Sequence, residues 1–297
     1  MNRVHYSRCP VCDSPEIKRT LEIKDFSVSG ETFELWECAA CNLRFTQDVP
    51  TEDSIGTYYQ SVDYISHSNT SKGLLNKVYQ AVRKLTLQQK AKLIISQTVQ
   101  KGSLLDIGAG IGAFLDTMQQ KGWKVQGIEP DAGARRNARE LFSLELMDTH
   151  YLESLPAASF DAITLWHVLE HIHQLHPYIQ KLKELLNPGG KIFIAVPNYT
   201  SADANIYGTY WAAYDVPRHL YHFTPVSIDK LMSRHQLKVS SKKRMWYDSF
   251  YISLLSSKYQ KGKTNWITAV VNGIRSDIKA VLSKDSCSSI IYIVERS

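Results

Sequence analysis

The sequence lacks the long apolar stretches that membrane proteins and secreted precursors carry. No run of 18 apolar residues occurs in the chain of 297 residues, so we predict no membrane-spanning helix. The first residues, MNRVHYSRCP, hold no apolar core of a signal peptide, and we therefore expect a cytoplasmic protein. Hydrophobic residues still make up 43% of the chain, which is enough for a core of ordinary size.

Cysteine is scarce, and its spacing excludes an ordinary disulfide framework. Four of the five cysteines form two C-x-x-C pairs separated by 25 residues: Cys9 with Cys12, and Cys38 with Cys41. In a reducing compartment such pairs indicate metal ligands before disulfides. Four thiolates around one tetrahedral Zn²⁺ leave no open position, so we predict a structural zinc ribbon. A redox pair is the alternative, but the strand–helix setting of such pairs is missing. The remaining Cys287 is expected to be a small core residue.

The chain also lacks a strong excess of one charge. Its net charge is +6, yet residues 1–48 hold 6 basic and 8 acidic side chains, whereas residues 200–297 hold 14 and 7. An RNA-binding ribbon needs a basic face, so the acidic ribbon argues against nucleic acid. Two interpretations stay open for the basic region around 242–282. It is either a helical insertion with a solvated face, or a grip on an anionic acceptor, with peripheral membrane contact as one form of it.

No repeat or low-complexity tract is visible, and hydrophobic periodicity predicts an alternating α/β order. A helix is expected over 73–98, and Asn187 to Gly190 predicts a turn. Strands are predicted at 103–108, 123–129, 160–166, 191–198, 237–245 and 288–296, with helices at 112–121, 131–142, up to about 186, 224–236 and through much of 246–282. Such alternation is typical of a mostly parallel sheet with helices on both faces. We expect three parts: a ribbon over 1–48, a linker or cover over 49–72, and the α/β domain over 73–297.

The most informative motif is a glycine-rich loop between the first predicted strand and helix of the α/β domain. Gly108, Gly110 and Gly112 alternate there, and glycines let the backbone turn sharply and approach a ligand closely. A dinucleotide fingerprint also fits, but Asp106 would repel a pyrophosphate and suits a ligand with an ammonium group. Glu129, which ends the next strand, can accept both hydroxyls of a ribose. The plainer alternatives are a tight turn without ligand and a solvated glutamate.

The segments LLDIGAGIGAF, GIEPD, FDAITLWHVLEHI and LLNPGGKIFIAVPN occur in this order, and together they resemble class I S-adenosylmethionine (SAM)-dependent methyltransferases over about 75–297. The resemblance implies a Rossmann-like, seven-stranded sheet with a final antiparallel strand, and SAM as the cofactor. It also implies the cofactor contacts. The methionine part would meet Asp106, Gly108, Ala109, Gly110, Gly112, Trp166 and His167, the ribose Glu129, and the adenine Tyr151 and Leu152.

The run from His167 to His171 literally matches the His-x-x-Glu-His motif of inverted zincins. Because it directly follows a buried strand, and because class I methyltransferases commonly carry a Glu-His pair at this place, we do not interpret it as a protease motif. Resemblance to ubiquinone-pathway O-methyltransferases leaves a metal-assisted role open for Glu170 or His171. Hydrogen bonding beneath the cofactor is the plainer interpretation.

Residues 214–224 gather histidines, an arginine and aromatic side chains beyond the fifth predicted strand. Loops at the carboxyl ends of parallel strands are where α/β sheets place substrates. The segment is similar to that of deoxysugar C-methyltransferases, which also carry C-x-x-C ribbons and use the matching histidine as a base. We therefore predict His219 as the base, with His222 and Tyr214 beside it, although Arg218 replaces the acid usual in that family. Alternatively, the two histidines only tie the loop to the helix that Thr224 opens.

Three functions follow from these features. The first is a methyltransferase acting on a small molecule, such as a sugar nucleotide, a glycan or a lipid intermediate. The second is an rRNA or tRNA methyltransferase with an RNA-binding ribbon; its Asn-Pro-Pro-Tyr-type motif is missing after the fourth strand, where Trp166 to Leu169 stand instead. The third is a non-catalytic SAM-binding scaffold, which the intact glycine loop and Glu129 argue against. The sequence leaves open the acceptor atom and the oligomeric state.

Overall fold

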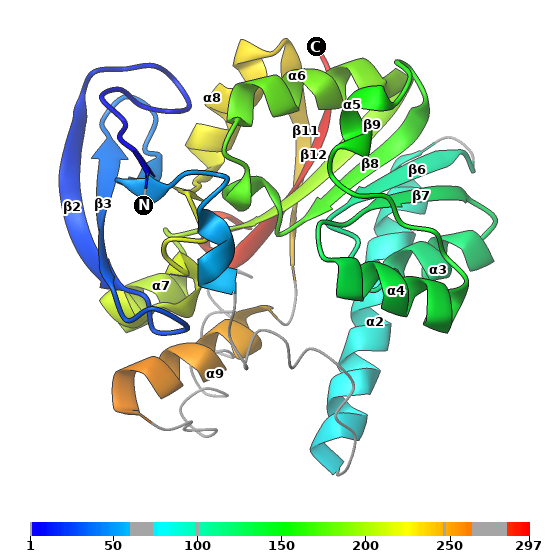
Figure 1. Ribbon diagram of the computed structural model, residues 1–297. Helices are drawn as coiled ribbons and strands as arrows, with labels where there is room; N and C mark the ends of the chain where they lie inside the picture. The colour runs from blue at the N-terminus through cyan, green and yellow to red at the C-terminus, as the bar shows by residue number, and fades with distance from the viewer. Residues whose placement is uncertain (1, 60–73, 99–100, 246–247, 263–283) are drawn as a thin grey trace.

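The computed structural model describes residues 2–59, 74–98, 101–245, 248–262 and 284–297 (Figure 1). An N-terminal group of short strands lies beside one end of a larger α/β unit. Within the described ranges, no helix is both long and apolar enough to cross a bilayer.

The N-terminal unit is built from antiparallel strands. Two small strands, β1 (Arg3–Val4) and β5 (Val49–Pro50), pair with each other. A second sheet contains β2 (Ile17–Lys24), β3 (Thr32–Cys38) and β4 (Arg44–Thr46). Its fourth strand, β10 (Tyr221–His222), comes from the far part of the chain and pairs with β4, giving the order β10-β4-β3-β2. The sequence did not predict this strand, because two residues carry no periodicity.

The central sheet has six strands among the described residues, in the order β11-β12-β9-β8-β6-β7. They are β6 (Ser103–Ile107), β7 (Lys124–Ile128), β8 (Phe160–Trp166), β9 (Leu186–Pro197), β11 (Leu237–Arg244) and β12 (Ser289–Arg296). The pairs among β6, β7, β8 and β9 are parallel, and β12 runs antiparallel between β9 and β11. The predicted final antiparallel strand is confirmed.

The predicted count of seven strands differs from the six observed. Next to β7, the chain makes only an isolated parallel bridge, between Met147 and Ile128. The amide of Tyr151 then bonds to the carbonyl of Asp148, so the chain turns away before a ladder can extend. Another difference concerns the turn predicted from Asn187 to Gly190, because β9 already begins at Leu186 and absorbs these residues through a register shift against β8.

Helices cover both faces of the sheet (Figure 1). They are α2 (Leu74–Gln97), α3 (Ala113–Gln120), α4 (Ala132–Phe142), α5 (Tyr151–Ser154), α6 (Leu175–Leu185), α7 (Ala202–Tyr207), α8 (Pro225–Arg234) and α9 (Asp248–Lys261), with 3-10 turns η1 (Ile55–Tyr59), η2 (Leu169–His171), η3 (Gly208–Tyr210), η4 (Ala212–Tyr214) and η5 (Lys284–Ser286). Asp131 caps α4 by accepting a hydrogen bond from the amide of Ala134, and Thr224 caps α8 with proline in the first turn. Of the helix predicted through 246–282, the structure describes α9, and residues 263–283 lie outside the described part.

Among the described residues, the N-terminal unit has no hydrophobic core separate from that of the larger unit. Cys38, Leu43 and Phe45 belong to one buried cluster together with Leu220 and Ile228 of the larger unit. Burial of apolar side chains in a shared cluster removes water from both partners at once. The two units therefore pack as one body around this core.

Candidate active site

The glycine loop connects β6 to α3 and has the conformation that its sequence requires. Gly108, Gly110 and Gly112 have φ angles of 70°, 54° and 81°, in the left-handed region that glycine adopts without strain. A Cβ atom on Gly108 would lie 2.5 Å from a methyl group of Val168, whereas nothing lies within 4 Å of one on Gly110. The loop thus packs tightly at its start and leaves open space beside Gly110, which suits a ligand approaching the backbone.

Glu129 lies directly against this loop at the end of β7. One carboxylate oxygen accepts a hydrogen bond from the amide of Gly110 at 2.8 Å, and the other accepts one from the amide of Asp131 at 3.0 Å. Burial raises the pKa of Glu129, which is 8% exposed, although the two amides oppose this shift. A carboxylate that faces the loop, not bulk water, fits the nucleoside of SAM. The contact with the ribose stays a prediction.

Asp106 is buried at 2% exposure near the carboxyl end of β6 and accepts a hydrogen bond from the hydroxyl of Thr164 at 2.6 Å. Burial raises its pKa to about 7, while that hydrogen bond and the positive charge of Lys90 lower it. A cationic ligand near the loop would lower it further. The residue types present therefore fit the ammonium group and sulfonium of SAM.

The other predicted cofactor contacts have different environments. Trp166 ends β8, with its ring edge-on to Phe114 at 5.6 Å. Leu152 is buried at 4% exposure and belongs to the core cluster, whereas Tyr151 is 39% exposed at the start of α5. Ala109, between two glycines of the loop, is 9% exposed. Their contacts with SAM are untested predictions, and Tyr151 offers the more accessible of the two side chains predicted for adenine.

His167, just past β8, lies between two acids. Its Nε2 is 2.9 Å from Asp248 Oδ2, and its Nδ1 is 3.3 Å from Glu170 Oε1. Burial opposes a charged ring, but the two carboxylates outweigh it and raise the pKa of His167 to about 10. The ring is therefore protonated at neutral pH. A protonated ring between two carboxylates is suited to stabilise the structure and not to act as a base. The predicted contact of His167 with the methionine part of SAM stays a prediction.

The three predicted catalytic residues come together beside β4. Tyr214 accepts a hydrogen bond from Arg44 at 3.1 Å, and its ring lies edge-on to His222 with centroids 5.3 Å apart. His222 is 3% exposed and is hydrogen-bonded through Nε2 to Thr46 at 3.1 Å; burial holds its pKa well below the usual value. His222 thus bonds to β4, and not to the helix that Thr224 opens. The catalytic roles of His222 and Tyr214 stay predictions.

His219 has a different arrangement. Its Nδ1 is 2.8 Å from the carbonyl of Ala213, which makes Nδ1 the protonated nitrogen of the neutral ring. The lone pair then lies on Nε2, which is 4.0 Å from Asp215 Oδ2. The ring of His171 meets that of His219 edge-on at 4.6 Å, and burial lowers the pKa of His171 to about 4. Such a neutral imidazole with an oriented Nδ1 can accept a proton at Nε2.

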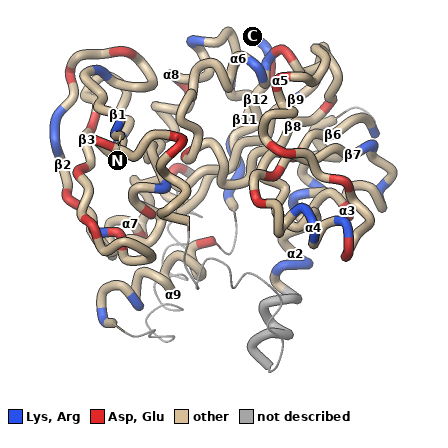
Figure 2. The backbone as a smooth tube through the Cα atoms, viewed as in Figure 1, with Lys and Arg blue, Asp and Glu red and all other residues tan. Residues whose placement is uncertain are grey.

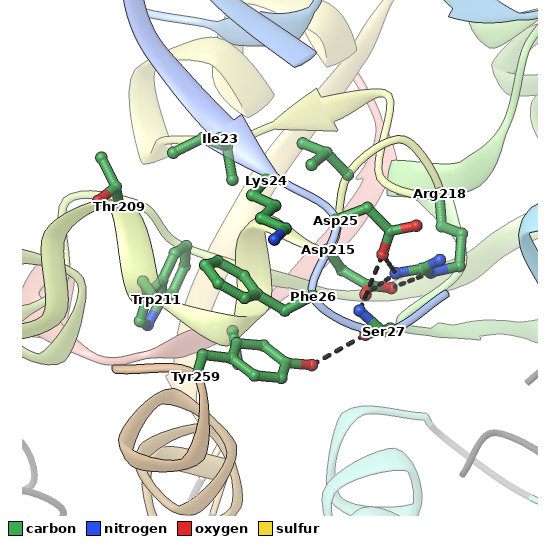
Figure 3. A pocket seen from close by; sticks show the side chains of 12 residues that line it. Ile23, Lys24, Asp25, Phe26, Ser27, Thr209, Trp211, Asp215, Arg218 and Tyr259 are labelled. Carbon is green, nitrogen blue, oxygen red and sulfur yellow. Dashed lines mark hydrogen bonds and ion pairs between the residues drawn. The ribbon is translucent and has the colours of Figure 1, made fainter. Parts of the chain in front are cut away.

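Sequence reasoning missed a buried ion network behind this loop. Arg218 is 1% exposed and donates to Asp215 at 2.7 Å and to Asp25 at 3.0 Å, as Figure 3 shows. Burial lowers the pKa of an arginine, but these two carboxylates outweigh it. Asp25 is 193 residues from Arg218, so no local pattern could reveal the pair. Arg218 thus bonds the loop to the N-terminal unit.

Two side-chain clusters among the described residues could hold a metal ion. One ligand atom each from Glu170, His171 and His219 lies within 4.8 Å of the other two, an arrangement that a divalent cation could occupy. The metal-assisted role of Glu170 or His171 stays a prediction. The second cluster contains Cys9, Cys12, Cys38 and Cys41.

The four thiols fit zinc. The sulfur atoms of Cys9 and Cys41 are 3.6 Å apart, and those of Cys12 and Cys38 are 3.5 Å apart. Tetrahedral zinc with bonds of about 2.3 Å to sulfur has edges of about 3.8 Å. The amides of Val11 and Cys12 point at Cys9 Sγ and stabilise a thiolate there. Four such ligands close the coordination shell, so this zinc would support structure and take no part in chemistry.

Known proteins resemble this chain both in sequence and in fold. A family described as a methyltransferase domain matches residues 79–242, which is more than half of the chain. An uncharacterized methyltransferase of Alkaliphilus oremlandii is 34% identical over 110 residues, covering 36% of this chain and 51% of that protein. A ubiquinone biosynthesis O-methyltransferase of Xanthomonas axonopodis pv. citri is 31% identical over 130 residues, covering 40% and 54%. The chain thus spans about half the length of these two relatives.

Solved structures agree on the fold. A SAM-dependent methyltransferase of Archaeoglobus fulgidus aligns with a TM-score of 0.52 at 18% identity, over 72% of this chain and 94% of that one. A geranyl diphosphate C-methyltransferase of Streptomyces coelicolor aligns with a TM-score of 0.53 at 14% identity, over 83% and 97%. With the glycine loop and Glu129 in place, these findings lead to one conclusion: the chain belongs to the SAM-dependent methyltransferases.

Proposed function

We propose that this methyltransferase modifies a small-molecule acceptor, which binds between the N-terminal unit and the carboxyl ends of β8 and β9. One observation carries the proposal. His219, with an oriented ring and a lone pair on Nε2, stands in a loop that contacts both η2 and β4. A base enclosed by two units is suited to a compact acceptor more than to a long polymer.

SAM supplies an electrophilic methyl group on its sulfonium. In the proposed reaction, the acceptor atom bonds to this methyl group as the carbon–sulfur bond breaks, giving S-adenosylhomocysteine and the methylated acceptor. His219 Nε2 takes the acceptor's proton, and the Asp215 carboxylate at 4.0 Å stabilises the imidazolium that forms. His219 thus serves as the base, while the loop geometry aligns the acceptor for in-line displacement.

A groove beside the N-terminal unit offers aromatic rings and the ammonium group of Lys24, with the carboxylate of Glu22 in the same lining. Figure 3 shows Lys24, Phe26 and Tyr259 around a hollow that reaches Arg218. The rings of Phe26 and Tyr259 stack at 4.9 Å. A groove of about 480 Å³ shares Lys24, Phe26 and Tyr259 with this hollow. Aromatic rings with a nearby ammonium group suit sugar nucleotides, glycans carrying charge, or lipid intermediates.

The charge distribution does not favour an RNA acceptor. Lys and Arg are interspersed with Asp and Glu along the described chain (Figure 2). In the basic region, Lys242 lies 3.6 Å from Asp229 and 3.9 Å from Asp285. A nucleic-acid site needs cations free to neutralise phosphates. We therefore retain the RNA methyltransferase only as an outcome of the test.

The test is SAM consumption by zinc-loaded protein over a panel of sugar nucleotides, quinols, lipids and RNA. We expect turnover with one small-molecule class, and a loss of about 100-fold in His219→Ala. The control His5→Ala changes an exposed ring and should keep full activity. Turnover with RNA alone would contradict the proposal, as would full activity of folded His219→Ala. SAM binding without turnover on any acceptor would favour a scaffold.

A further inference from the structure

We infer that Thr46, a residue of the N-terminal unit, positions the catalytic histidine for methyl transfer. The inference rests on the proposed role of His219 and deepens it. It also assigns a task to the cysteine-bearing unit, because β4 then forms one wall of the catalytic centre.

Two contacts from β4 hold the two peptide groups that follow His219. The hydroxyl of Thr46 donates to the carbonyl of His219 at 2.7 Å. The amide of Thr46 donates to the carbonyl of Leu220 at 2.9 Å. One residue therefore holds two successive carbonyls of the loop, one through its side chain and one through its backbone.

The opposite side of the same loop is held by η2. His171 Nδ1 lies 2.9 Å from the carbonyl of Arg218, and the amide of Leu220 donates to the carbonyl of Glu170 at 2.8 Å. The loop is thus fixed between two elements, of which η2 belongs to the SAM-binding domain. Without the β4 contacts, the loop would keep its η2 contacts and the bonds of His219 to Ala213 and Asp215, but it would lose the hold on the two carbonyls that follow.

The Thr46 hydroxyl makes a second contact that depends on the first. A hydroxyl has one proton, so a group that donates to the carbonyl of His219 must accept from His222 Nε2, 3.1 Å away. This fixes the ring of His222 with its proton on Nε2. Thr46 is 0% exposed, so no water can easily replace the hydroxyl. Its removal leaves both partners buried without it.

The experiment compares variants of the full-length, zinc-loaded enzyme, using the acceptor that the panel identifies. Thr46→Val keeps the shape and removes the hydroxyl, and we expect kcat to fall about 10-fold with KM for SAM unchanged, because misplacing a catalytic group by 1 Å costs up to about 100-fold. Thr46→Ser restores the hydroxyl and should recover most of kcat. The matched control is Thr20→Val, since Thr20 also donates to a backbone carbonyl, that of Leu35, but within the N-terminal unit.

A second readout needs no acceptor. Ring ¹⁵N chemical shifts of His219 and His222 should change in Thr46→Val and stay unchanged in Thr20→Val. Equal loss of kcat in both valine variants, or unchanged kcat in Thr46→Val, would overturn the inference. If Thr46→Val fails to fold, Thr46→Ala is judged by the same outcomes. Full activity of His219→Ala would instead defeat the proposed function, which separates the two failures.

Discussion

The cofactor side and the proposed acceptor side of this protein are assembled in different ways. On the cofactor side, Asp106, the glycine loop and Glu129 lie within one β-α-β stretch, and Gly110 and Glu129 are 19 residues apart when they bond. On the acceptor side, the bond from Thr46 to His219 spans 173 residues. The first arrangement is local and the second depends on the packing of two units. We therefore expect a disturbance of the N-terminal unit to reduce turnover before it reduces cofactor binding.

The largest expected effect comes from removing zinc. Structural zinc sites contribute on the order of 10 kcal/mol to folding, and Cys38 and Cys41 belong to the core cluster that includes Leu220. We expect Cys41→Ser to abolish turnover while binding of S-adenosylhomocysteine, measured by calorimetry, weakens only a few-fold. Native turnover in metal-free protein would show that β4 keeps its place without zinc. That result would contradict the dependence of the proposed acceptor side on the N-terminal unit.

The next effect concerns the buried cation that joins the two units. Arg218→Met leaves the carboxylates of Asp25 and Asp215 without their cation, and breaking a buried pair costs about 3–5 kcal/mol. We expect a lower melting temperature in thermal denaturation. Turnover should fall by a larger factor than the affinity for the cofactor. The control Arg139→Ala removes an exposed pair with Glu145 and should change stability little. Equal stabilities would mean that the network does not couple the units.

A change on the cofactor side should give the reverse pattern. Gly110→Val places a branched side chain at a φ of 54° and fills the open space beside the loop. Because the valine side chain would fill the space where we expect the cofactor, we expect SAM to bind about 10- to 100-fold more weakly in calorimetry. Zinc content should remain at one equivalent. Unchanged affinity would sink the assignment of this loop to SAM.

The smallest effect is a pH dependence of stability. The ordinary pKa of a histidine is 6.5. Burial lowers the pKa of His167, but its two acidic neighbours outweigh burial and raise the pKa to about 10. Its stabilisation is therefore fully present below pH 6.5 and is lost as the pH rises through 10. We expect the free energy of unfolding, measured with urea, to fall as the pH rises across this window. His167→Gln should flatten that slope; an unchanged slope in the variant would assign it to other groups.

The sequence predicted the local features well. Strand β8 has the predicted bounds, and Asp131 and Thr224 cap the helices that they were expected to cap. The prediction of a seventh strand was wrong because the hydrogen bonding next to β7 stops after Met147. Where it stops depends on how the following turn folds. The four cysteines were found by their spacing, and their sulfur atoms do come together.

The acceptor side was predicted only as a set of residue types. Histidines, an arginine and aromatic residues between 214 and 224 indicated a substrate loop, but not which ring would be engaged by the protein. His222 turned out to bond Thr46, and Arg218 to bond Asp25. Both partners lie in the N-terminal unit, and pairings over such separations leave no periodic trace in the chain. Only the folded arrangement distinguishes the two histidines. His219 keeps a lone pair on Nε2, whereas Nε2 of His222 is hydrogen-bonded to Thr46.

The position of β12 in the central sheet bears on how this protein is made. Residues 289–296 lie between β9 and β11. Until these residues have left the ribosome, β9 has only β8 as a partner, and β11 lacks the strand that joins it to the sheet. Pairing over this distance along the chain is slow compared with helix formation. Nascent chains halted before this strand would expose two unpaired edges to chaperones and proteases, whereas the glycine loop and its two strands would already be free to form.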